Sequence, residues 1–225
     1  MLTIFSIAMS VALLLGVEKV RVNAQSSFAN TISGTDLIVG ARSGSIQLLL
    51  YSVFRIGDAT NNISFQSYQD IAQQKGVKWT IPISLGDSHR GFRVMGTSRD
   101  YFSVYQYGEQ RTLEFASGKQ FEGVFDAVIG SEVANVLNYA IGDQVIVSHG
   151  TGSASFTQHK DKPFVISGIL KHTGTPVDRT LHVSLAGIEA MHVNWQGAVK
   201  KRKASKALTE ANLQPESITA FLVGL

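Results

Sequence analysis

The first seventeen residues constrain this chain more than any other part of it. Leu2 to Val17, LTIFSIAMSVALLLGV, contains no charged residue and consists mainly of Leu, Ile, Val, Met and Ala. Its 16 residues fall just short of the about 20 that a helix needs to cross a bilayer. The run therefore predicts either the outer part of a transmembrane helix or the apolar core of a signal peptide.

Two observations bear on this choice. A signal peptide would have a suitable cleavage site at Val22-Asn23-Ala24, but no Lys or Arg precedes the apolar run. The next segment, EKVRVNAQSSFANTI, contains no helix breaker, and apolar residues continue through it at steps of three and four: Val17, Val20, Ala24, Phe28 and Ile32. Because a cleaved signal does not need this stripe, residues 1–33 favour a transmembrane end that continues as a stalk helix. A buried helix of a soluble protein is the third alternative.

Composition excludes several classes of function. The 225 residues are 44% hydrophobic and 16% charged, which is typical of a folded domain. The absence of Cys excludes thiol nucleophiles, cysteine zinc sites and disulfides. The net charge is only +3, and the basic run KKRK at 200–203 has no interleaved aromatic residues. We therefore interpret that run as a solvated linker and expect no nucleic-acid partner.

The rest of the chain alternates short strand and helix patterns, which predicts an α+β fold. DLIV at 36–39 indicates a strand, and NNISFQSYQDIAQQKG predicts a helix that begins at Ser64. KWTIPISLG and GFRVMGTS are strand patterns, and the polar DSHR between them predicts a hairpin loop. Further on, a strand ends at Gly130, Ser131 is placed to cap a short helix, and QVIVSH and PFVISGIL are strands. The aromatic-rich RDYFSVYQYG is interpreted as packing at a lobe interface rather than as a ligand platform.

The polar motifs do not combine into a catalytic or cofactor site. Ser148 and His149 are adjacent, but the Gly-x-Ser-x-Gly pattern of a nucleophile elbow is missing, and GTGSAS lacks the Lys of a phosphate loop. No two His have the i, i+4 spacing of a helical zinc site. His149 and His159 flank a predicted hairpin tip, so weak metal binding there is an alternative to ordinary surface His. We expect no catalytic residue, no cofactor and no tight metal site.

The stretch KHTGTPVDRTLHVSLAGIEAMH, from Lys171 to His192, is interpreted as architectural. Thr173 to Pro176 predicts a turn, followed by a strand and a short helix. Asp178 and Arg179 are neighbours, so on a strand they would point to opposite faces and could not form a catalytic pair.

Taken in order, these segments resemble the extracytoplasmic domain of FtsX-like ABC transporter permeases of the MacB and LolC/LolE type. A helix leaving the membrane is followed by DLIVGARSG and NNISFQSYQDIA. AVIGSEVANVLNYAIGDQVIVSHG is similar to the family's strand, helix, Gly-Asp and strand pattern. PFVISGILKHTGTPVDRTLHVSLAGIEAMH is similar to its F-x-V-x-G-I-L strand and the helix that follows. The resemblance covers nearly the whole chain and depends on the order of these segments.

The resemblance implies a porter-like α+β lobe and a smaller β-rich lobe after the transmembrane and stalk helix. We assign residues 1–33 to the helix, 34–120 to the first part of the porter-like lobe and 121–196 to the β-rich lobe. Residues 197–225 would be a linker and a returning strand, with a truncated C-terminus. Asp178 and Arg179 would lie at the rim of the β-rich lobe, well outside the membrane, as a candidate partner contact. The alternative is that one of them makes a local bond that holds the turn.

The implied function is that of a non-catalytic permease subunit in a bacterial inner membrane, with most of this chain in the periplasm. Such permeases pair as homo- or heterodimers and bind a separate cytoplasmic ATPase, whose motion passes through the stalk to the outer domain. In the outer domain this motion drives efflux or the release of a lipoprotein or lipid. The expected partners are the ATPase, a second permease subunit, a periplasmic protein and the membrane. The alternative is a secreted periplasmic binding protein with a cleaved signal peptide, whose ligand could be a metal bound through its His residues.

Overall fold

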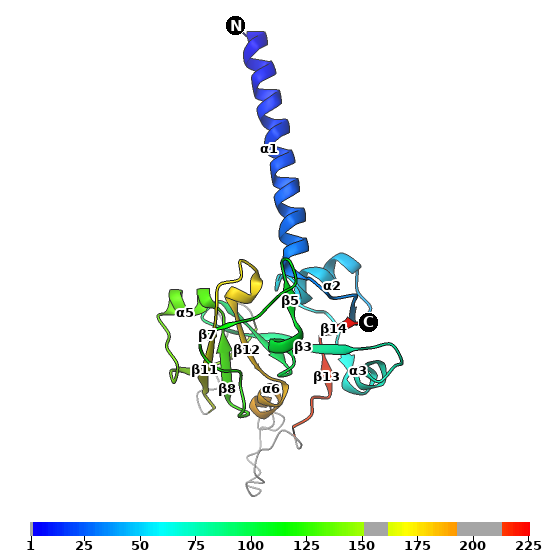
Figure 1. Cartoon of the computed structure of the whole chain (residues 1–225), viewed down its shortest axis with the longest axis vertical. Coiled ribbons are helices and arrows are strands. Elements are labelled where there is room, and N and C mark those ends of the chain that lie inside the picture. Colours follow the sequence, from blue (N-terminus) through cyan, green and yellow to red (C-terminus); the bar gives the residue numbers. More distant parts are fainter. Residues whose placement is uncertain (1, 151–161, 193–212) are drawn as a thin grey trace, which may run out of the picture.

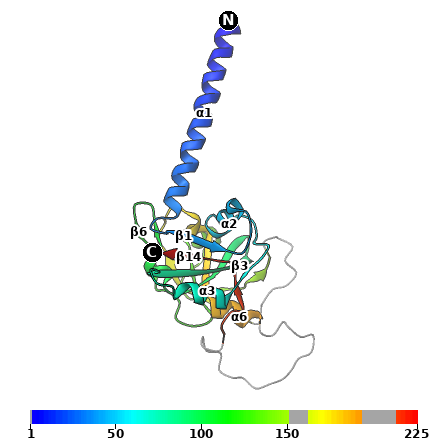
Figure 2. The same ribbon diagram turned by 90° about the vertical axis from the view of Figure 1, so that its right-hand side faces the viewer.

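The computed structural model describes residues 2–150, 162–192 and 213–225. One long helix, α1 (Leu2–Thr31), extends away from a mixed body of strands and short helices (Figures 1 and 2). By length and composition α1 is apolar enough to cross a membrane over Leu2–Asn23, which is 22 residues. The helix runs without a break through the cleavage site considered at Val22-Asn23-Ala24.

The body is built on one mixed sheet of ten strands in the described ranges. In chain order these are β1 (Leu37–Gly40), β3 (Trp79–His89), β4 (Phe92–Thr97), β7 (Phe115–Gly118), β8 (Asp126–Ile129), β9 (Gln144–Val145), β10 (Ser148–His149), β11 (Phe164–Leu170), β12 (Thr180–Ser184) and β14 (Ala220–Gly224). Two small antiparallel pairs lie outside it: β2 (Ile63–Ser64) with β13 (Ser217–Ile218), and β5 (Gln106–Tyr107) with β6 (Arg111–Thr112).

The strand order is β1-β14-β3-β4-β12-β8-β11-β7, with β10 beside β3 and β9 beside β11. β12 pairs in parallel with β4, β11 pairs in parallel with β8, and the other described pairs of this sheet are antiparallel. Because β12 lies between β4 and β8, strands from 34–120 and 121–196 share one sheet, and the lobe boundary between them stays a prediction. The C-terminal strand β14 lies between β1 and β3, beside the start of the body (Figure 1).

Short helices cover the sheet. They are α2 (Ser45–Ser52), α3 (Phe65–Ala72), α4 (Tyr101–Val104), α5 (Ser131–Leu137), the 3₁₀ helix η1 (Pro176–Arg179) and α6 (Leu185–His192). Side chains alternate along the strands, so Ala127 and Ile129 of β8 join an apolar cluster with α5 and α6, whereas Val128 joins a second cluster with α4. Both faces are therefore buried, and this explains why the central strands are apolar throughout. The predicted α+β class is confirmed.

The predicted hairpin of β3 and β4 is present, but DSHR is not its loop. Residues 87–89 continue β3 and are buried. The turn consists of Arg90 and Gly91, with φ of 46° and 86°. Two successive positive φ values are what a type I′ hairpin turn requires.

Two further local predictions have different outcomes. Ser64 caps α3 as predicted, because its Oγ accepts a hydrogen bond from the Ser67 backbone N–H at 3.1 Å. Ser131 does not cap α5: it is the first helical residue, and Gly130 occupies the cap position. A Cβ at Gly130 would lie 2.2 Å from the Val177 carbonyl oxygen, so glycine is needed there for close packing against η1. QVIVSH forms two short strands, β9 and β10, rather than one.

Candidate functional site at the base of the long helix

The last residue of α1 is fixed to the body. Thr31 is 3% exposed, and its carbonyl oxygen accepts a hydrogen bond from the Tyr105 hydroxyl. The final carbonyls of a helix have no partner within the helix, so this hydroxyl satisfies one of them. Two residues further on, the Ser33 backbone N–H donates to the Gln106 carbonyl at 3.1 Å. The helix therefore enters the body at a defined point, against the segment that follows α4.

Aromatic rings continue this attachment into the core. The Tyr105 ring lies 4.9 Å from the Tyr101 ring, and Tyr101 stacks on the His182 imidazole at 5.1 Å between centroids. Phe102 approaches the same imidazole edge-on at 5.9 Å. All four side chains are buried. We call Tyr105, Tyr101 and His182 the aromatic stack; it leads from the end of α1 to the central strand β12.

The aromatic stack is electrically neutral. His182 Nδ1 lies 3.2 Å from the Val128 carbonyl oxygen, so a neutral imidazole must carry its proton there and donate it. Burial, with a smaller contribution from the nearby Arg55 charge, lowers the pKa of His182 to about 3. Burial likewise raises the pKa of Tyr101, and that of Tyr105 to about 12. These groups pack as uncharged rings at neutral pH and do not form an acid–base pair.

Arg55 lies beside the aromatic stack in an unfavourable environment. Its φ is 60°, in the left-handed region that costs a residue with a side chain roughly 1–3 kcal/mol. Its Nε and Nη1 are buried and have no hydrogen-bond partner in the described part of the chain. The charge partly offsets the effect of burial on the pKa of Tyr101.

The turn at 173–179 is held by the Asp178 carboxylate. Asp178 is 3% exposed and accepts hydrogen bonds from the Thr173 and Gly174 backbone N–H groups, both at 2.8 Å. The Thr173 hydroxyl donates to it at 3.0 Å, and His172 Nδ1 lies 2.9 Å from it. Asp178 belongs to η1, so the condition of lying on a strand, under which the two neighbours were compared, does not apply to it. Its carboxylate instead makes the local bonds that were the alternative interpretation.

Arg179 has a different environment. Its side chain is 59% exposed, pairs with Glu132 of α5 and lies over the Phe92 ring at 5.1 Å. Arg179 is therefore accessible, whereas Asp178 is not. Contact of Arg179 with a partner stays a prediction.

The turn and the base of α1 line one cavity of about 660 Å³. Its walls include Thr31, Arg55, Arg93, Asp178 and Arg179. Figure 1 shows the turn, coloured yellow, on the side of the body from which α1 leaves. The prediction that this turn lies at the rim of a β-rich lobe, well outside the membrane, stays a prediction.

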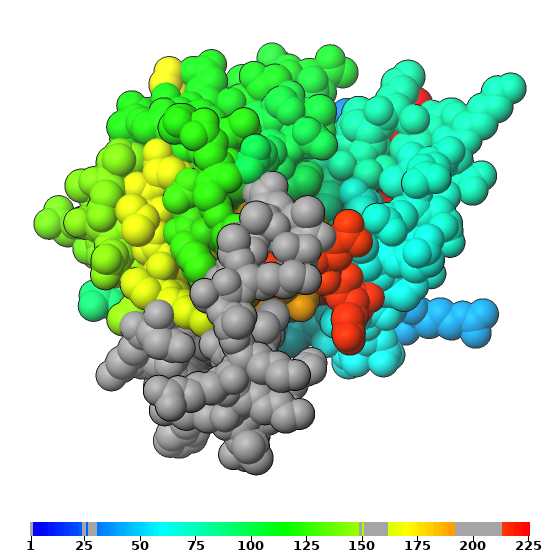
Figure 3. Space-filling view, turned by 90° about the horizontal axis from the view of Figure 1, so that it is seen from below, coloured from blue at the N-terminus to red at the C-terminus, as the bar shows by residue number. Residues whose placement is uncertain are grey.

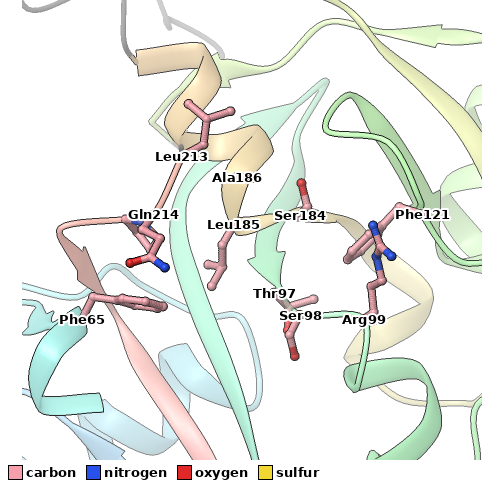
Figure 4. Close-up of a pocket in the computed structure, with 11 residues that line it drawn as sticks. Phe65, Thr97, Ser98, Arg99, Phe121, Ser184, Leu185, Ala186, Leu213 and Gln214 are labelled. Carbon is pink, nitrogen blue, oxygen red and sulfur yellow. The ribbon is translucent and has the colours of Figure 1, made fainter. Parts of the chain in front are cut away.

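A second cavity of about 270 Å³ lies where α6 approaches the C-terminal segment (Figure 4). This end of the body is opposite α1, and Figure 3 shows the C-terminal segment there in red beside the residues coloured cyan. The lining residues include Ser98, Arg99 and Ser184 but no His, Asp or Glu. Ser184 Oγ accepts from the Gly187 backbone N–H at 2.9 Å, so it serves as a helix cap. This cavity offers no acid–base pair.

A family model described as the MacB-like periplasmic core domain matches residues 1–214. The chain belongs to this family. It is the periplasmic domain of a MacB-type ABC transporter permease, with a candidate membrane helix at its N-terminal end. This confirms the resemblance found in the sequence, and such a domain is not a catalytic one.

Two solved structures are similar to this MacB-like domain. The periplasmic region of MacB from Actinobacillus actinomycetemcomitans is 13% identical with a TM-score of 0.47, over 84% of this chain and 72% of that one. The extracellular domain of the noncanonic ABC-type transporter YknZ from Gram-positive bacteria is 12% identical with a TM-score of 0.42, over 72% of each chain. No curated protein sequence matches the chain.

The sequence-predicted residues are distributed over this domain. Val17 and Val20 are 61% and 69% exposed on α1, while only the backbone is described for Ala24 and Phe28. His159 and the side chain of His149 lie outside the described residues. Among the described residues, no three His, Asp or Glu side chains are grouped so as to hold a metal ion.

Sequence reasoning missed the residues that join α1 to the body. The aromatic-rich RDYFSVYQYG signalled that Tyr101 and Tyr105 are packed, and they are buried as expected. Nothing in that segment indicated that Tyr105 binds the end of α1, which is 74 positions earlier. The sequence around Arg55 did not indicate a buried or functional arginine, because this segment resembles an ordinary loop after an apolar run.

Proposed function

We propose that this MacB-like domain couples ATP hydrolysis by a separate cytoplasmic ATPase to an extracytoplasmic event, such as efflux or the release of a lipoprotein or lipid. In this proposal Leu2–Asn23 lies in the bacterial inner membrane, and the body lies in the periplasm. The observation that carries the proposal is the attachment of Thr31 to Tyr105, and through Tyr101 to His182 on β12.

The physical reason is that a helix transmits movement only if its end is fixed. A flexible joint at Thr31 would absorb a tilt or shift of α1. The joint is instead buried, and close-packed interiors transmit strain because they have little free volume. A shift of α1 would therefore move the central strand β12 and the elements packed on it.

The remaining partners are assigned to α1 and to the turn, where Val17, Val20 and Arg179 are exposed. We propose that the stripe Val17, Val20, Ala24 and Phe28 contacts a second permease subunit. Arg179 is the candidate contact for a periplasmic protein. The uninterrupted course of α1 through Val22-Asn23-Ala24 favours this function over a secreted binding protein.

Spin labels in the full-length permease with its ATPase test the proposal. Because this chain has no Cys, labelled cysteines at Ser26 on α1 and Lys75 on the body would be unique in this domain. The distance between them should differ between the ATP-bound and ADP-bound complexes. Tyr105→Phe, which removes the bond to Thr31, should reduce that difference and broaden the distances.

Tyr107→Phe is the matched control. It removes a neighbouring hydroxyl that makes no hydrogen bond in the described part of the chain, so it should behave as the wild type. If the distance changes with nucleotide in Tyr105→Phe as it does in the wild type, the bond between Tyr105 and Thr31 is not needed for coupling. A wild-type protein without any nucleotide response would remove the coupling function itself.

A further inference from the structure

The cavity at the base of α1 has a cationic wall formed by Arg55, Arg93 and Arg179. Two of these charges have acidic partners. Arg93 pairs with Asp58 at 2.7 Å, and Arg179 pairs with Glu132. Arg55 differs, because its buried Nε and Nη1 have no hydrogen-bond partner in the described residues.

The two acidic residues of the cavity wall are already bound to groups other than Arg55. The Asp178 carboxylate accepts three hydrogen bonds from Thr173 and Gly174, and Glu132 binds Arg179. Arg55 is half-buried beside the Tyr101 hydroxyl, and its guanidinium loses hydration at Nε and Nη1 without gaining a negatively charged partner there. An anion in the cavity beside Arg55 would supply the acceptor that Nε and Nη1 lack in the described part of the chain.

The backbone around Arg55 supports this interpretation. Arg55 and Gly57 both have positive φ, 60° and 76°. Arg93 Nη2 donates to the Gly57 carbonyl at 2.7 Å, which holds the loop in place. An unfavourable backbone persists only where surrounding contacts impose it, and such positions concentrate at ligand sites.

We propose that this cavity binds an oxyanion, a phosphate or carboxylate group, through the Arg55 guanidinium. A guanidinium presents several N–H donors in a planar fork that matches such groups. The volume of about 660 Å³ is within the usual range for small-molecule sites. The inference does not depend on the coupling function proposed above.

The position of the cavity favours an anionic lipid as the source of the oxyanion. Phe54, Ile56 and Phe92 give the cavity an apolar wall next to the arginines. Thr31 lies eight residues beyond Asn23, the end of the apolar span. These eight residues of helix are about 12 Å long, whereas the headgroup layer on one side of a bilayer is roughly 5–8 Å thick. A headgroup raised by a few ångströms would therefore reach Arg55, and a soluble oxyanion would reach it directly.

Calorimetric titration of the full chain in a nonionic detergent tests the proposal. The probes are dihexanoyl phosphatidylglycerol and inorganic phosphate, with dihexanoyl phosphatidylcholine as the zwitterionic control at equal ionic strength. One anionic probe or both should bind saturably at one site. Arg55→Met should weaken that binding about tenfold or more, because it removes charge-assisted hydrogen bonds. Arg42→Met, an exposed arginine outside the cavity wall, should leave the affinity unchanged.

A second pair of variants decides the matter even if Arg55→Met does not fold. Ile56 is 59% exposed at the cavity, so its substitution should not disturb the core. Ile56→Glu should weaken anion binding, and Ile56→Lys should preserve or strengthen it. Binding of phosphatidylglycerol alone supports the lipid source, and binding of phosphate as well supports any oxyanion. Equal binding of phosphatidylcholine, equal loss in Arg42→Met, or no difference between the Ile56 variants would each overturn the proposal.

Discussion

His182 is the residue at which packing and protonation are most closely linked in this domain. It is fully buried, stacks on Tyr101 and donates to the Val128 carbonyl. Its Nε2 has no hydrogen-bond partner in the described residues, so the ring is held mainly by contact. Protonation would place a charge in this apolar environment, so the folded protein binds that proton more weakly than the unfolded chain does.

The stability of the domain should therefore fall in mild acid. The pKa of His182 is lowered from 6.5 to about 3, so the unfolded chain binds the proton first. This contribution to stability is complete above the unfolded pKa and is lost as the pH falls toward the folded one. One such group gives a slope of about 1.4 kcal/mol per pH unit. Urea unfolding at several pH values should show the slope, and His182→Asn should reduce it. His89, whose pKa burial also lowers, is unchanged in both proteins. Equal slopes would contradict the assignment.

Buried polar residues also limited what the sequence could predict. Residues 87–89 were assigned to a loop because they are polar, yet they continue β3. His89 bonds to the Ile146 carbonyl and the Tyr139 hydroxyl, at 2.7 and 2.9 Å. These partners are 57 and 50 positions away, so no local pattern could indicate that the polar groups would be satisfied.

At the scale of elements, the turn at 173–179 shows how a short segment can be fixed by one side chain. The Thr-Gly-Thr-Pro pattern correctly predicted a turn, because Gly174 supplies a positive φ and Pro176 begins η1. The pattern could not show that α5 covers it, which depends on the close approach of Gly130. Burial of Asp178 follows from that packing.

Asp178 and Arg179 should consequently differ in their effects on stability. Asp178→Ala removes the buried carboxylate that accepts from the backbone N–H groups of Thr173 and Gly174, which should lower the unfolding free energy by about 2–4 kcal/mol. Arg179→Ala removes an exposed ion pair and should change it by less than about 1 kcal/mol. Denaturant unfolding of the two variants provides the comparison. If Arg179→Ala were as damaging as Asp178→Ala, its role as a partner contact would have to be abandoned. If it is not, weaker co-purification with a periplasmic partner is expected.

At the scale of the whole molecule, strand pairing joins distant parts of the chain. Leu37 of β1 pairs with Val223 of β14, and Leu181 of β12 pairs with both Val94 and Ile129. Alternation of short strands and helices was enough to predict the α+β class. Strand order was not predictable, because pairing depends on contacts across the sheet rather than on local pattern. The base of α1 was missed for the same reason.

The apolar stripe of α1 gives the last prediction. Val20 and Val22 are 69% and 52% exposed, and both lie within Leu2–Asn23. Two residues along a helix rotate the side chain by about 200°, so Val22 faces away from Val20. An Asp at position 20 or 22 would cost a similar free energy of insertion, because the two positions lie at a similar depth in the membrane. Only Val20→Asp would also bury an unpaired carboxylate against a second subunit, which costs several kcal/mol.

In the full-length permease, Val20→Asp should therefore reduce dimer formation at least about tenfold, while Val22→Asp retains it. Native mass spectrometry of both variants in lipid nanodiscs measures the dimer fraction directly. The unfolding midpoint of the periplasmic body should be unchanged in both, because neither side chain contacts it. Equal loss of dimer in the two variants would mean that membrane depth alone is responsible, and that the stripe is not an interface. A loss confined to Val20→Asp would place the second subunit on the same helix that the Tyr105 hydroxyl fixes to the body, so that subunit association and the joint at Thr31 would act on one rigid element.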